Sequence, residues 1–385
     1  MKSVYLDYAA TTPVDREVTE SMLPFFGEIF ANPSSVHTPG QRARAAVEKT
    51  RSIAAALLGA AAEEIIFTSG GTESNNLAVK GLAAARRHLG DHIITSAIEH
   101  HAVLRPCETL EREGFRITRL NVDSAGLLDP ADVKKAMTDK TILISIMHAN
   151  NEIGTIQPIE EIGRMARERG VPFHTDAVQT FGHLPIDVSR LNVDALSASA
   201  HKFYGPKGVG FLYLRKGTRI LPQMEGGDQE RNRRASTHNV PGIVGLGKAA
   251  ELAEAGMAAE MKRLTEMRDF AVERILGEIG QAHLNGHPSA RLPNNINVRF
   301  DGVEGEALLF SLDMAGIACS SGSACTSSSV DPSHVLAAIG LARQAAHSSL
   351  RFSLGRGTTG GDIEYLLETL AATVARLRSL SKRGA

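Results

Sequence analysis

The chain has 385 residues, in which 42 Lys and Arg nearly balance 43 Asp and Glu. A formal net charge of −1 gives no reason to expect a nucleic acid or an anionic membrane as a partner. No stretch approaches the ~20 apolar residues of a membrane span, and the first residues do not form a basic and then apolar leader, so we expect a cytoplasmic protein. Three irregularly spaced cysteines exclude a disulfide framework and a four-thiolate zinc site.

From about residue 64 the sequence alternates short apolar runs, rich in β-branched residues, with segments of helical spacing. This alternation is typical of the α/β class, in which helices cover a mainly parallel sheet. The segments Leu77–His88 and Ile159–Arg169 are predicted to be helices because they are rich in Ala, Arg, Leu and Glu. The predicted strands are Glu64–Thr68, His92–Ser96, Thr141–His148, Val171–Thr175, Val193–Ser197 and Gly208–Leu214.

Near Pro241 the pattern changes to one long helical stretch, Ile243–Gly280, which could bridge two domains. We therefore expect a large domain over residues 14–255 and a smaller α+β domain built from residues 1–13 and 256–385. The elements predicted after the long helix are a strand at Asn294–Phe300, a helix at Glu304–Met314, a strand at Ser349–Ser353 and a terminal helix at Asp362–Leu380.

Lys202 and Asp176 form the strongest pair of candidate functional residues. Lys202 follows the end of a predicted strand, and alone it would be interpreted as a solvated lysine. Asp176 follows another predicted strand, at the sheet edge where open α/β sheets bind ligands. A lysine amine can bond covalently to an aldehyde, and an aspartate can pair with a protonated pyridine nitrogen. A helix N-cap is the alternative role for Asp176, and the presence of Lys202 favours a pyridoxal-phosphate site instead.

The segment containing Gly71 and Thr72 comes directly after the first predicted strand and opens a predicted helix. A helix N-terminus offers free N–H groups to a phosphate, and glycine lets the backbone approach it. An ordinary strand–turn–helix junction would look the same. The segment has neither the Walker lysine pattern nor the glycine fingerprint of dinucleotide binding.

Two polar clusters follow predicted strands and could face the same cleft: Glu99-His100-His101 and Asn150-Asn151-Glu152. His100 could stack on a cofactor ring and exchange protons near neutral pH, or it could be an ordinary surface or N-capping histidine. Metal binding by His100 and His101 is disfavoured because adjacent side chains rarely converge on one ion. We therefore expect no metal site in the resting protein.

Cys325 lies in a run of small polar residues, Cys319-Ser320-Ser321-Gly322-Ser323-Ala324-Cys325. This setting suits an exposed nucleophile on a flexible loop, although a linker with an incidental thiol would have the same composition. Cys319 follows an apolar run and is predicted to be a small buried residue. Cys107 lies in a helix-like segment and is also predicted to serve packing.

Taken together, these motifs resemble the cysteine desulfurases of iron–sulfur cluster assembly, in the nitrogen-fixation and housekeeping group with a short active loop. The resemblance covers nearly the whole chain. The motifs that carry it are Leu6-Asp7-Tyr8-Ala9-Ala10-Thr11-Thr12-Pro13, Asn32-Pro33-Ser34-Ser35, Gly71-Thr72-Glu73-Ser74-Asn75, Glu99-His100, Asn150-Asn151-Glu152-Ile153-Gly154, His174-Thr175-Asp176-Ala177-Val178-Gln179, Ala200-His201-Lys202, Gly226-Gly227-Asp228-Gln229-Glu230 and Arg351-Phe352-Ser353-Leu354-Gly355-Arg356.

The resemblance implies a fold-type I pyridoxal-phosphate enzyme of the class-V aminotransferase family, with a seven-stranded sheet in the large domain. It further implies a homodimer with L-cysteine as substrate, and a loop over residues 320–334 whose Cys325 takes up sulfur as a persulfide. An iron–sulfur scaffold or another sulfur-acceptor protein would then receive the sulfur, with Cys325 as a transient iron–sulfur ligand during transfer. Selenocysteine cleavage, another aminotransferase-type reaction on the same scaffold and a non-catalytic role remain the alternatives.

The resemblance also assigns roles to individual residues. Lys202 would hold the cofactor aldehyde, and Lys202 and His100 would carry protons. Ser236 departs from the pattern, since the family often has glycine there, and this puts the backbone before Thr237 in doubt if that glycine needs a positive φ. The other implied roles are the pyridine nitrogen for Asp176, the ring face for His100, the ring oxygen and substrate surroundings for Gln179 and Asn151, the phosphate for Gly71, Thr72, Ser199 and His201 with Thr237 of a neighbouring subunit, and the substrate carboxylate for Arg351.

Overall fold

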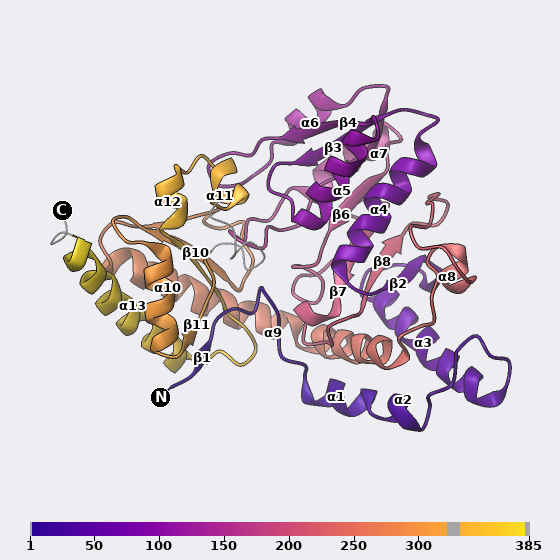
Figure 1. Ribbon diagram of the computed structural model, residues 1–385, viewed down its shortest axis with the longest axis horizontal. Helices are drawn as coiled ribbons and strands as arrows, with labels where there is room; N and C mark the ends of the chain where they lie inside the picture. The colour runs from indigo at the N-terminus through magenta and orange to yellow at the C-terminus, as the bar shows by residue number, and fades with distance from the viewer. Residues whose placement is uncertain (1, 322–331, 382–385) are drawn as a thin grey trace.

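The computed structural model describes residues 2–321 and 332–381 (Figure 1). Among these residues, a seven-stranded sheet with the order β2-β8-β7-β6-β5-β3-β4 forms the centre of the larger part of the molecule. The predicted α/β class and seven-stranded sheet are confirmed. The strands are β2 (Ile65–Thr68), β3 (His92–Ser96), β4 (Arg116–Leu120), β5 (Thr141–Ser145), β6 (Phe173–Asp176), β7 (Ala195–Ser199) and β8 (Gly210–Leu214).

The sheet is mainly parallel because only β8 runs against its neighbours. It pairs antiparallel with both β2 and β7, and the pairs between β3, β4, β5, β6 and β7 are parallel. The carboxyl ends of six strands therefore meet at one edge of the sheet. Parallel α/β sheets bind ligands at this edge.

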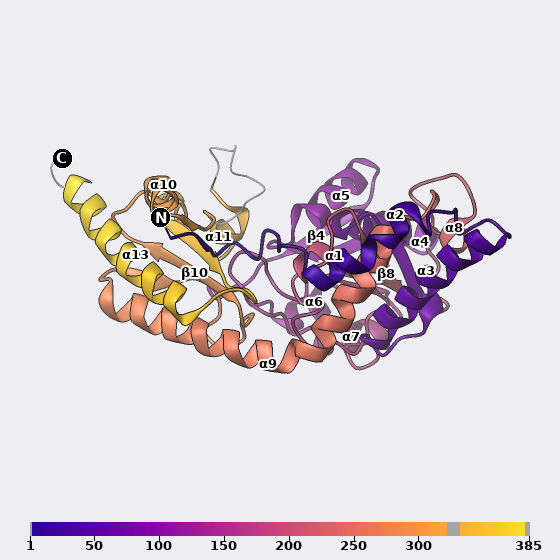
Figure 2. The ribbon, with the colours of Figure 1, turned by 90° about the horizontal axis from the view of Figure 1, so that it is seen from below.

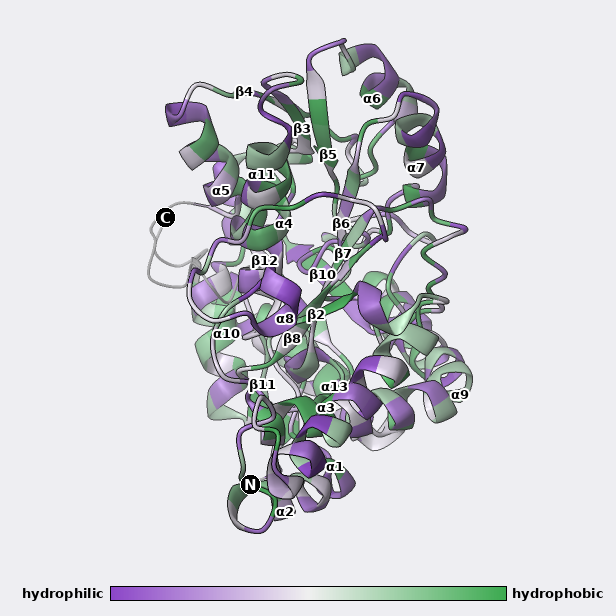
Figure 3. Ribbon diagram, turned by 90° about the vertical axis from the view of Figure 1, so that its right-hand side faces the viewer, coloured by the Kyte–Doolittle hydropathy of each residue, from purple (hydrophilic) through white to green (hydrophobic). Residues whose placement is uncertain are grey.

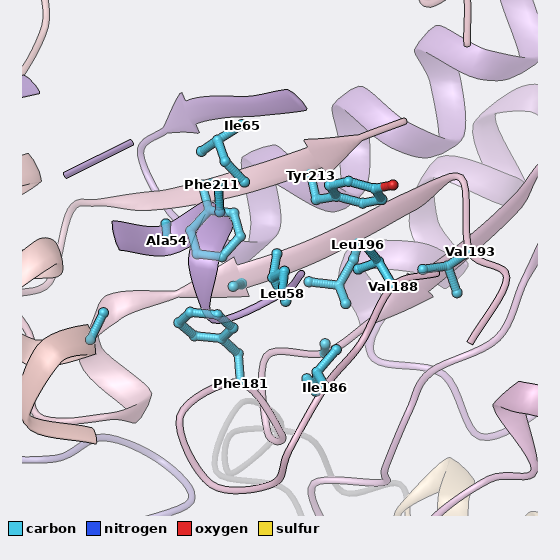
Figure 4. Close-up of a cluster of buried hydrophobic side chains, with 14 of the residues drawn as sticks. Ala54, Leu58, Ile65, Phe181, Ile186, Val188, Val193, Leu196, Phe211 and Tyr213 are labelled. Carbon is cyan, nitrogen blue, oxygen red and sulfur yellow. The ribbon is translucent and has the colours of Figure 1, made fainter. Parts of the chain in front are cut away.

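Successive residues of the strands alternate between two hydrophobic cores, one on each face of the sheet. Ile65 and Phe67 of β2 belong to one core, and Ile66 between them belongs to the other. This alternation follows from the two-residue period of a strand. Figure 4 shows part of the first core, where Phe181 packs edge-on against Phe211 with ring centroids 5.0 Å apart.

Helices cover both faces of this sheet and alternate hydrophobic with hydrophilic residues along their length (Figure 3). The predicted helices at Leu77–His88 and Ile159–Arg169 correspond to α4 and α7. The helices of the larger part are α1 (Arg16–Met22), α2 (Pro24–Gly27), α3 (Thr38–Ala56), α4 (Gly71–Arg86), α5 (His101–Arg112), α6 (Pro130–Ala136), α7 (Ile159–Glu168) and α8 (Gln229–Asn232), with short 3-10 turns at η1 (Ala62–Glu64) and η2 (Ala200–Lys202).

The smaller part of the molecule has its own core, which includes Val4 and Leu6 from the start of the chain. Within the described residues it contains a three-stranded antiparallel sheet, β12-β10-β9, and a parallel pair of β1 with β11. The domain limits predicted from the sequence stay a prediction. The elements here are β1 (Val4–Tyr5), β9 (Ala282–Leu284), β10 (Asn295–Phe300), α10 (Gly305–Met314), β11 (Ile317–Ala318), α11 (His334–Ala338), α12 (Arg343–His347), β12 (Ser349–Ser353) and α13 (Gly360–Ser381).

One long helix, α9 (Val240–Glu278), extends along both parts (Figure 2). Its first turns bury Val240 and Ile243 in the core of the larger part, and its last turns bury Ala271 and Ile275 in the core of the smaller part. The bridging helix predicted at Ile243–Gly280 is confirmed to within a few residues.

Several elements have no counterpart in the sequence prediction. The edge strand β4 has the sequence Arg-Ile-Thr-Arg-Leu, in which the two arginines are exposed and the other residues are half-buried, so it lacks a continuous apolar run. Helix α3 buries mainly small residues such as Ala43 and Ala54, which give a weak periodic signal. Within the described ranges, no helix combines the length and the hydrophobicity that crossing a lipid bilayer requires.

Candidate active site

A cavity of about 270 Å³ lies at the carboxyl edge of the large sheet. It is lined by residues from strand ends, from the start of α4, from the N-terminal segment and from β12 of the smaller part. All predicted site residues except Thr237 and Cys325 contribute to it, and Cys325 lies outside the described residues. The predicted residues that line it are Gly71, Thr72, His100, Asn151, Asp176, Gln179, Ser199, His201, Lys202 and Arg351.

Lys202 reaches the cavity from the turn η2, which follows β7 directly. Its side chain is half-buried, and Nζ donates hydrogen bonds to the carbonyl oxygens of Ala9 (2.6 Å) and Ala10 (2.8 Å). The N-terminal segment thus orients the amine toward the cavity. The interpretation of Lys202 as an ordinary solvated lysine is wrong.

Asp176 is the last residue of β6 and is 6% exposed. Its Oδ2 accepts a hydrogen bond from Asn75 Nδ2 at 2.6 Å, and its Oδ1 accepts one from the Val178 N–H at 3.0 Å. It caps no helix in the described structure, so the alternative N-cap role is wrong. Both carboxylate oxygens therefore accept a hydrogen bond from the protein, which fixes the orientation of the carboxylate at the cavity.

The start of α4 forms one end of the cavity. No side chain caps this helix, and Gly70 before it has a φ of 147°, which favours glycine. A Cβ added to Gly71 would come within 2.6 Å of Val178 Cγ2, so only glycine keeps this space open. Ser199 ends β7 beside Gly70. This end of the cavity therefore offers free backbone N–H groups to an anion.

His201 completes that end of the cavity. Its Nδ1 lies 3.1 Å from Thr11 Oγ1. Burial and the neighbouring Lys202 lower the pKa of His201 to about 4. His201 is therefore neutral at physiological pH and can act only as a hydrogen-bonding group.

His100 is the N-cap of α5, and its Nδ1 accepts a hydrogen bond from the Ala102 N–H at 3.0 Å. The N-capping interpretation is confirmed, and the same ring also lines the cavity, whereas stacking on a cofactor ring and proton exchange stay predictions. Burial lowers the pKa of His100, while Asp176 opposes that shift. A proton on Nδ1 would abolish the cap, so the neutral ring carries its proton on Nε2.

Arg351 enters the cavity from β12 and is 1% exposed. Its Nη2 contacts Asp7 Oδ1 at 2.7 Å, and its Nη1 donates to the carbonyl oxygen of Asn151 at 2.9 Å. Its Nε is buried and has no hydrogen-bond partner in the described part of the chain. A buried guanidinium with an unmatched donor can accept a carboxylate.

Gln179 and Asn151 are more constrained than the sequence indicates. Gln179 Nε2 donates to the carbonyl oxygen of Ala9 at 3.0 Å, so it shares with Lys202 the task of holding the N-terminal segment. The loop of Asn151 is fixed by Asn150, whose Nδ2 donates to the carbonyl oxygen of Ile98 at 2.9 Å. This bond joins the two polar clusters after β3 and β5, which confirms that both face one cleft.

Thr237 is exposed and does not line the cavity of its own chain. Its segment, residues 224–238, has an unusual backbone. Glu230, Arg231 and Asn232 have φ values of 48°, 56° and 62°, and Ser236 has a φ of 98°. Ser236, at the position where the family often has glycine, thus has a positive φ in this chain, which a residue with a side chain adopts only with strain.

The sequence analysis assigned no individual role to three residues that the structure places at or near the site. Asn75 was quoted only as part of a motif, yet it is the donor to Asp176. Glu99 is fully buried, and burial raises its pKa to about 8. Asp7 pairs with Arg351. Asn75 and Asp7 could not be found by spacing because their partners lie 101 and 344 residues away.

The predicted loop at 320–334 is described only at its two ends. Ser333 donates to Glu152 Oε2, and His334 Nε2 contacts the carbonyl oxygen of Glu99 at 2.9 Å. The end of the loop is therefore attached to both polar clusters of the cavity. Cys107 is buried as predicted, whereas Cys319, which was also predicted to be buried, is only partly buried and packs against the core of the smaller part.

The donor set fits pyridoxal phosphate. It combines an uncapped helix start for a phosphate, a hydrogen-bonded carboxylate for a pyridine nitrogen, a lysine amine for the aldehyde and an unmatched guanidinium for a carboxylate. Asn75 Oδ1, which also lies at this site, is buried without a hydrogen-bond partner in the described residues and could accept a hydrogen bond from a ligand. Among residues 2–321 and 332–381, no cluster of three or more His, Cys, Asp or Glu side chains could hold a metal ion.

An α/β fold with this cavity is typical of fold-type I pyridoxal-phosphate enzymes, and comparisons with known proteins agree. The aminotransferase class-V model matches residues 4–366. Cysteine desulfurase IscS of Dictyoglomus turgidum is 57% identical over 99% of this chain and 96% of that protein, and that of Methanosarcina thermophila is 55% identical over 99% and 94%. A solved NifS-like protein superposes with a TM-score of 0.92 at 39% identity, covering 98% of this chain and 100% of that one. The structure of "SspA in complex with cysteine" superposes with a TM-score of 0.83 at 43% identity, over 91% and 99%.

The chain therefore belongs to the aminotransferase class-V family, and within it to the cysteine desulfurases. Enzymes of this family depend on pyridoxal phosphate, which is the cofactor of this protein.

Proposed function

We propose that this protein converts L-cysteine to L-alanine and transfers the sulfur to Cys325 as a persulfide. The observation that carries the proposal is the convergence of Lys202, Asp176 and Arg351 in one cavity. These residues come from β7–η2, β6 and β12, so neither half of the chain contains the site alone. The names of the relatives, including one solved with cysteine, support the choice of substrate.

In this proposal the cavity residues divide between cofactor and substrate. Lys202 would hold the aldehyde, and Asp176 would pair with the pyridine nitrogen and favour its protonated form. When bound, pyridoxal phosphate supplies an electron-accepting ring that stabilises negative charge at the substrate Cα. The residues that would hold the phosphate are Gly71, Thr72, Ser199 and His201, joined by Thr237 of a second subunit.

Arg351 would hold the carboxylate of L-cysteine through its unmatched Nε and one Nη. Asp7 and the carbonyl oxygen of Asn151 each contact one Nη of the guanidinium, so Nε is the donor that remains for the substrate carboxylate. Asn151 and Gln179 would lie beside the amino acid and the cofactor ring. Lys202 Nζ and His100 Nε2 would move the proton at the substrate carbon atoms.

The sulfur transfer uses the Cys325 thiolate as a nucleophile. A sulfur–sulfur bond forms, the carbon–sulfur bond of L-cysteine breaks, and its electron pair stays on carbon, where a proton completes L-alanine. No external oxidant or reductant is needed, because the carbon is reduced as Cys325 becomes the persulfide.

The test is to incubate the purified holoenzyme with L-cysteine, locate added sulfur by mass spectrometry and measure L-alanine in the same tube. One sulfur atom on Cys325 with matching alanine is expected. Lys202→Ala should lower alanine formation by roughly 10²–10⁴-fold, and Cys325→Ser should abolish the persulfide. Full activity in either variant would refute the proposal, and turnover restricted to selenocysteine would favour a selenocysteine lyase.

We further propose that the protein is a cytoplasmic homodimer that passes sulfur to an iron–sulfur scaffold or another acceptor protein. Support for a dimer comes from the exposed apolar side chains of Leu23, Phe26 and Phe30 around α2, which are 60%, 65% and 75% exposed. Light scattering on the purified holoenzyme tests it, and a monomer at micromolar concentration would contradict it.

A further inference from the structure

A second pocket, of about 400 Å³, lies at the amino edge of the large sheet, opposite the cofactor cavity. Val171 and Pro172 lie just before β6, Asp194 lies just before β7, and Arg215 follows the end of the antiparallel strand β8. The last turns of α4 and α7 complete the wall. The cofactor cavity and this pocket thus lie at opposite ends of α4.

Positive charge dominates the described residues that line this pocket. Four arginines contribute to it, Arg86, Arg167, Arg215 and Arg219, and Asp194 is the one carboxylate among these lining residues. All the described basic side chains of the lining other than His88 are arginines. Guanidinium groups bind phosphate in a bidentate manner, so this lining favours a phosphate ligand.

Asp194 does not neutralise these charges. Its Oδ1 contacts Arg215 Nε at 3.0 Å and Arg167 Nη2 at 3.8 Å, and its Oδ2 accepts a hydrogen bond from the Phe173 N–H at 2.9 Å. Arg215 also donates to the carbonyl oxygen of Val193 at 2.6 Å. One carboxylate is therefore shared by Arg215 and Arg167, and within the described residues Arg86 and Arg219 have no carboxylate within ion-pair distance.

Arg86 and Arg219 have N–H groups that make no hydrogen bond within the described residues. Arg86 Nη2 donates to the carbonyl oxygen of Gly170 at 3.2 Å, but its buried Nε has no partner in the described part of the chain. Burial lowers the pKa of Arg86, and Asp194 opposes that shift. Within the same described ranges, Arg219 makes no ion pair or hydrogen bond. Arg86 is the last residue of α4, where the partial negative charge of a helix C-terminus stabilises a cation. This interaction does not provide a hydrogen-bond partner for Nε.

The rest of the wall is apolar. Ala85, Leu89, Val171 and Pro172 line the pocket, and Leu89 is 48% exposed. The volume lies within the range of small-molecule sites, and a planar organic group could cover these side chains. Such a division into a basic and an apolar half fits an anion with an organic substituent.

We propose that this pocket binds an organic diphosphate, such as a nucleoside diphosphate, with its phosphates on Arg86 and Arg219 and its organic group on Leu89 and Pro172. A diphosphate carries enough charge to compensate the arginines that Asp194 leaves unmatched. The site is independent of the proposed cysteine chemistry.

Isothermal titration calorimetry on the holoenzyme tests this, because bound cofactor keeps its own phosphate site filled. ADP, inorganic pyrophosphate and adenosine are the probes, in about 0.1 M salt. Saturable binding of one ADP per chain and none of adenosine is expected. Pyrophosphate binding as tightly as ADP would assign the site to the free diphosphate, and weaker binding would assign it to a nucleotide.

Arg219→Gln and Arg86→Gln should each weaken ADP binding by about tenfold or more. Arg219 is exposed and its replacement should not disturb folding, so it keeps the test valid if Arg86→Gln is unstable. Arg16→Gln, whose side chain is 91% exposed on α1, is the matched control and should bind as the wild type does. Undetectable ADP binding, or equal affinities in wild type and both pocket variants, would overturn the proposal.

Discussion

Two buried arginines, Arg51 and Arg351, differ in how completely their donors are used. Arg51 is 4% exposed and Arg351 is 1% exposed. Arg51 makes two hydrogen bonds to Glu230, at 2.7 and 2.8 Å, one to the carbonyl oxygen of Ile65 and one to Glu48. Arg351 has one carboxylate partner, Asp7, and its Nε is unmatched within the described residues.

The difference teaches that burial alone does not separate a structural arginine from a ligand-binding one. Arg51 has the full set of partners that a buried ion pair needs to repay its desolvation. The carboxylate of Glu230 also accepts from the Phe67 N–H at 3.0 Å and contacts His238 at 2.6 Å. That network holds the left-handed segment before Thr237. At Arg351, the missing partner marks the place for a substrate.

The largest effect is expected for Glu230→Gln, which breaks the saturated pair. A lost buried ion pair should lower the free energy of unfolding by about 3–5 kcal/mol. Urea unfolding followed by circular dichroism measures this, since the chain contains no tryptophan. The control Glu20→Gln removes an exposed ion pair on α1 and should change stability little. Equal stabilities of Glu230→Gln and the control would show that the pair is not structural.

The stabilisation by the Arg51–Glu230 pair should depend on pH. Burial alone would raise the pKa of Glu230, but hydrogen bonds from Arg51 and His238 outweigh it and lower the pKa from 4.5 to about 2. The stabilisation is therefore complete above pH 4.5 and is lost as the pH falls toward 2. The stability difference between wild type and Glu230→Gln should narrow over that range.

Arg351→Lys should have the next largest effect, on substrate binding rather than on folding. A lysine can keep the contact with Asp7 but cannot bind a carboxylate in a bidentate manner, so the KM for L-cysteine should rise by about 10- to 100-fold. Arg51→Lys is the matched variant and should destabilise the protein without changing KM. Steady-state kinetics and urea unfolding measure the two effects. An unchanged KM in Arg351→Lys, or a raised KM in Arg51→Lys, would contradict the distinction between the two arginines.

Ser236→Gly should stabilise the protein by about 1 kcal/mol, because it relieves the side-chain strain at a φ of 98°. Ser189→Gly is the control at an exposed serine without a positive φ, and it should be neutral or destabilising. The difference between the two thermal midpoints is the measurement. A destabilising Ser236→Gly would mean that the Glu230 network does not hold strained backbone.

The smallest effect is expected for Glu99→Gln. Burial raises the pKa of Glu99 to about 8, and hydrogen bonds from Ser96 and Met147 only partly oppose the shift. The carboxyl group is thus neutral at pH 7, and glutamine should change kcat/KM by less than about threefold. Its stabilisation in the wild type is present below pH 4.5 and is lost as the pH rises toward 8. A stability profile in Glu99→Gln with the wild-type slope between pH 5 and 8 would contradict this.

Local sequence was sufficient where a single segment carries the signal. It located the strands that end in Asp176 and Ser199, the helix start at Gly71 and the long helix α9, because period and glycine placement are local properties. The resemblance to the desulfurases then identified ten of the cavity residues. The edge strand β4 was missed because its polar and apolar residues are mixed and form no continuous apolar run.

The sequence by itself determined the chemical groups of the site: the amine of Lys202, the carboxylate of Asp176 and the guanidinium of Arg351. Only the tertiary structure decided which donors remain unmatched, and this count separates Arg351 from Arg51 and Arg86 from Arg215. The physical reason is that a hydrogen bond depends on the approach of atoms within about 3 Å. Chain folding brings together groups such as Asp7 and Arg351, which are 344 residues apart, and no local sequence pattern predicts such a contact.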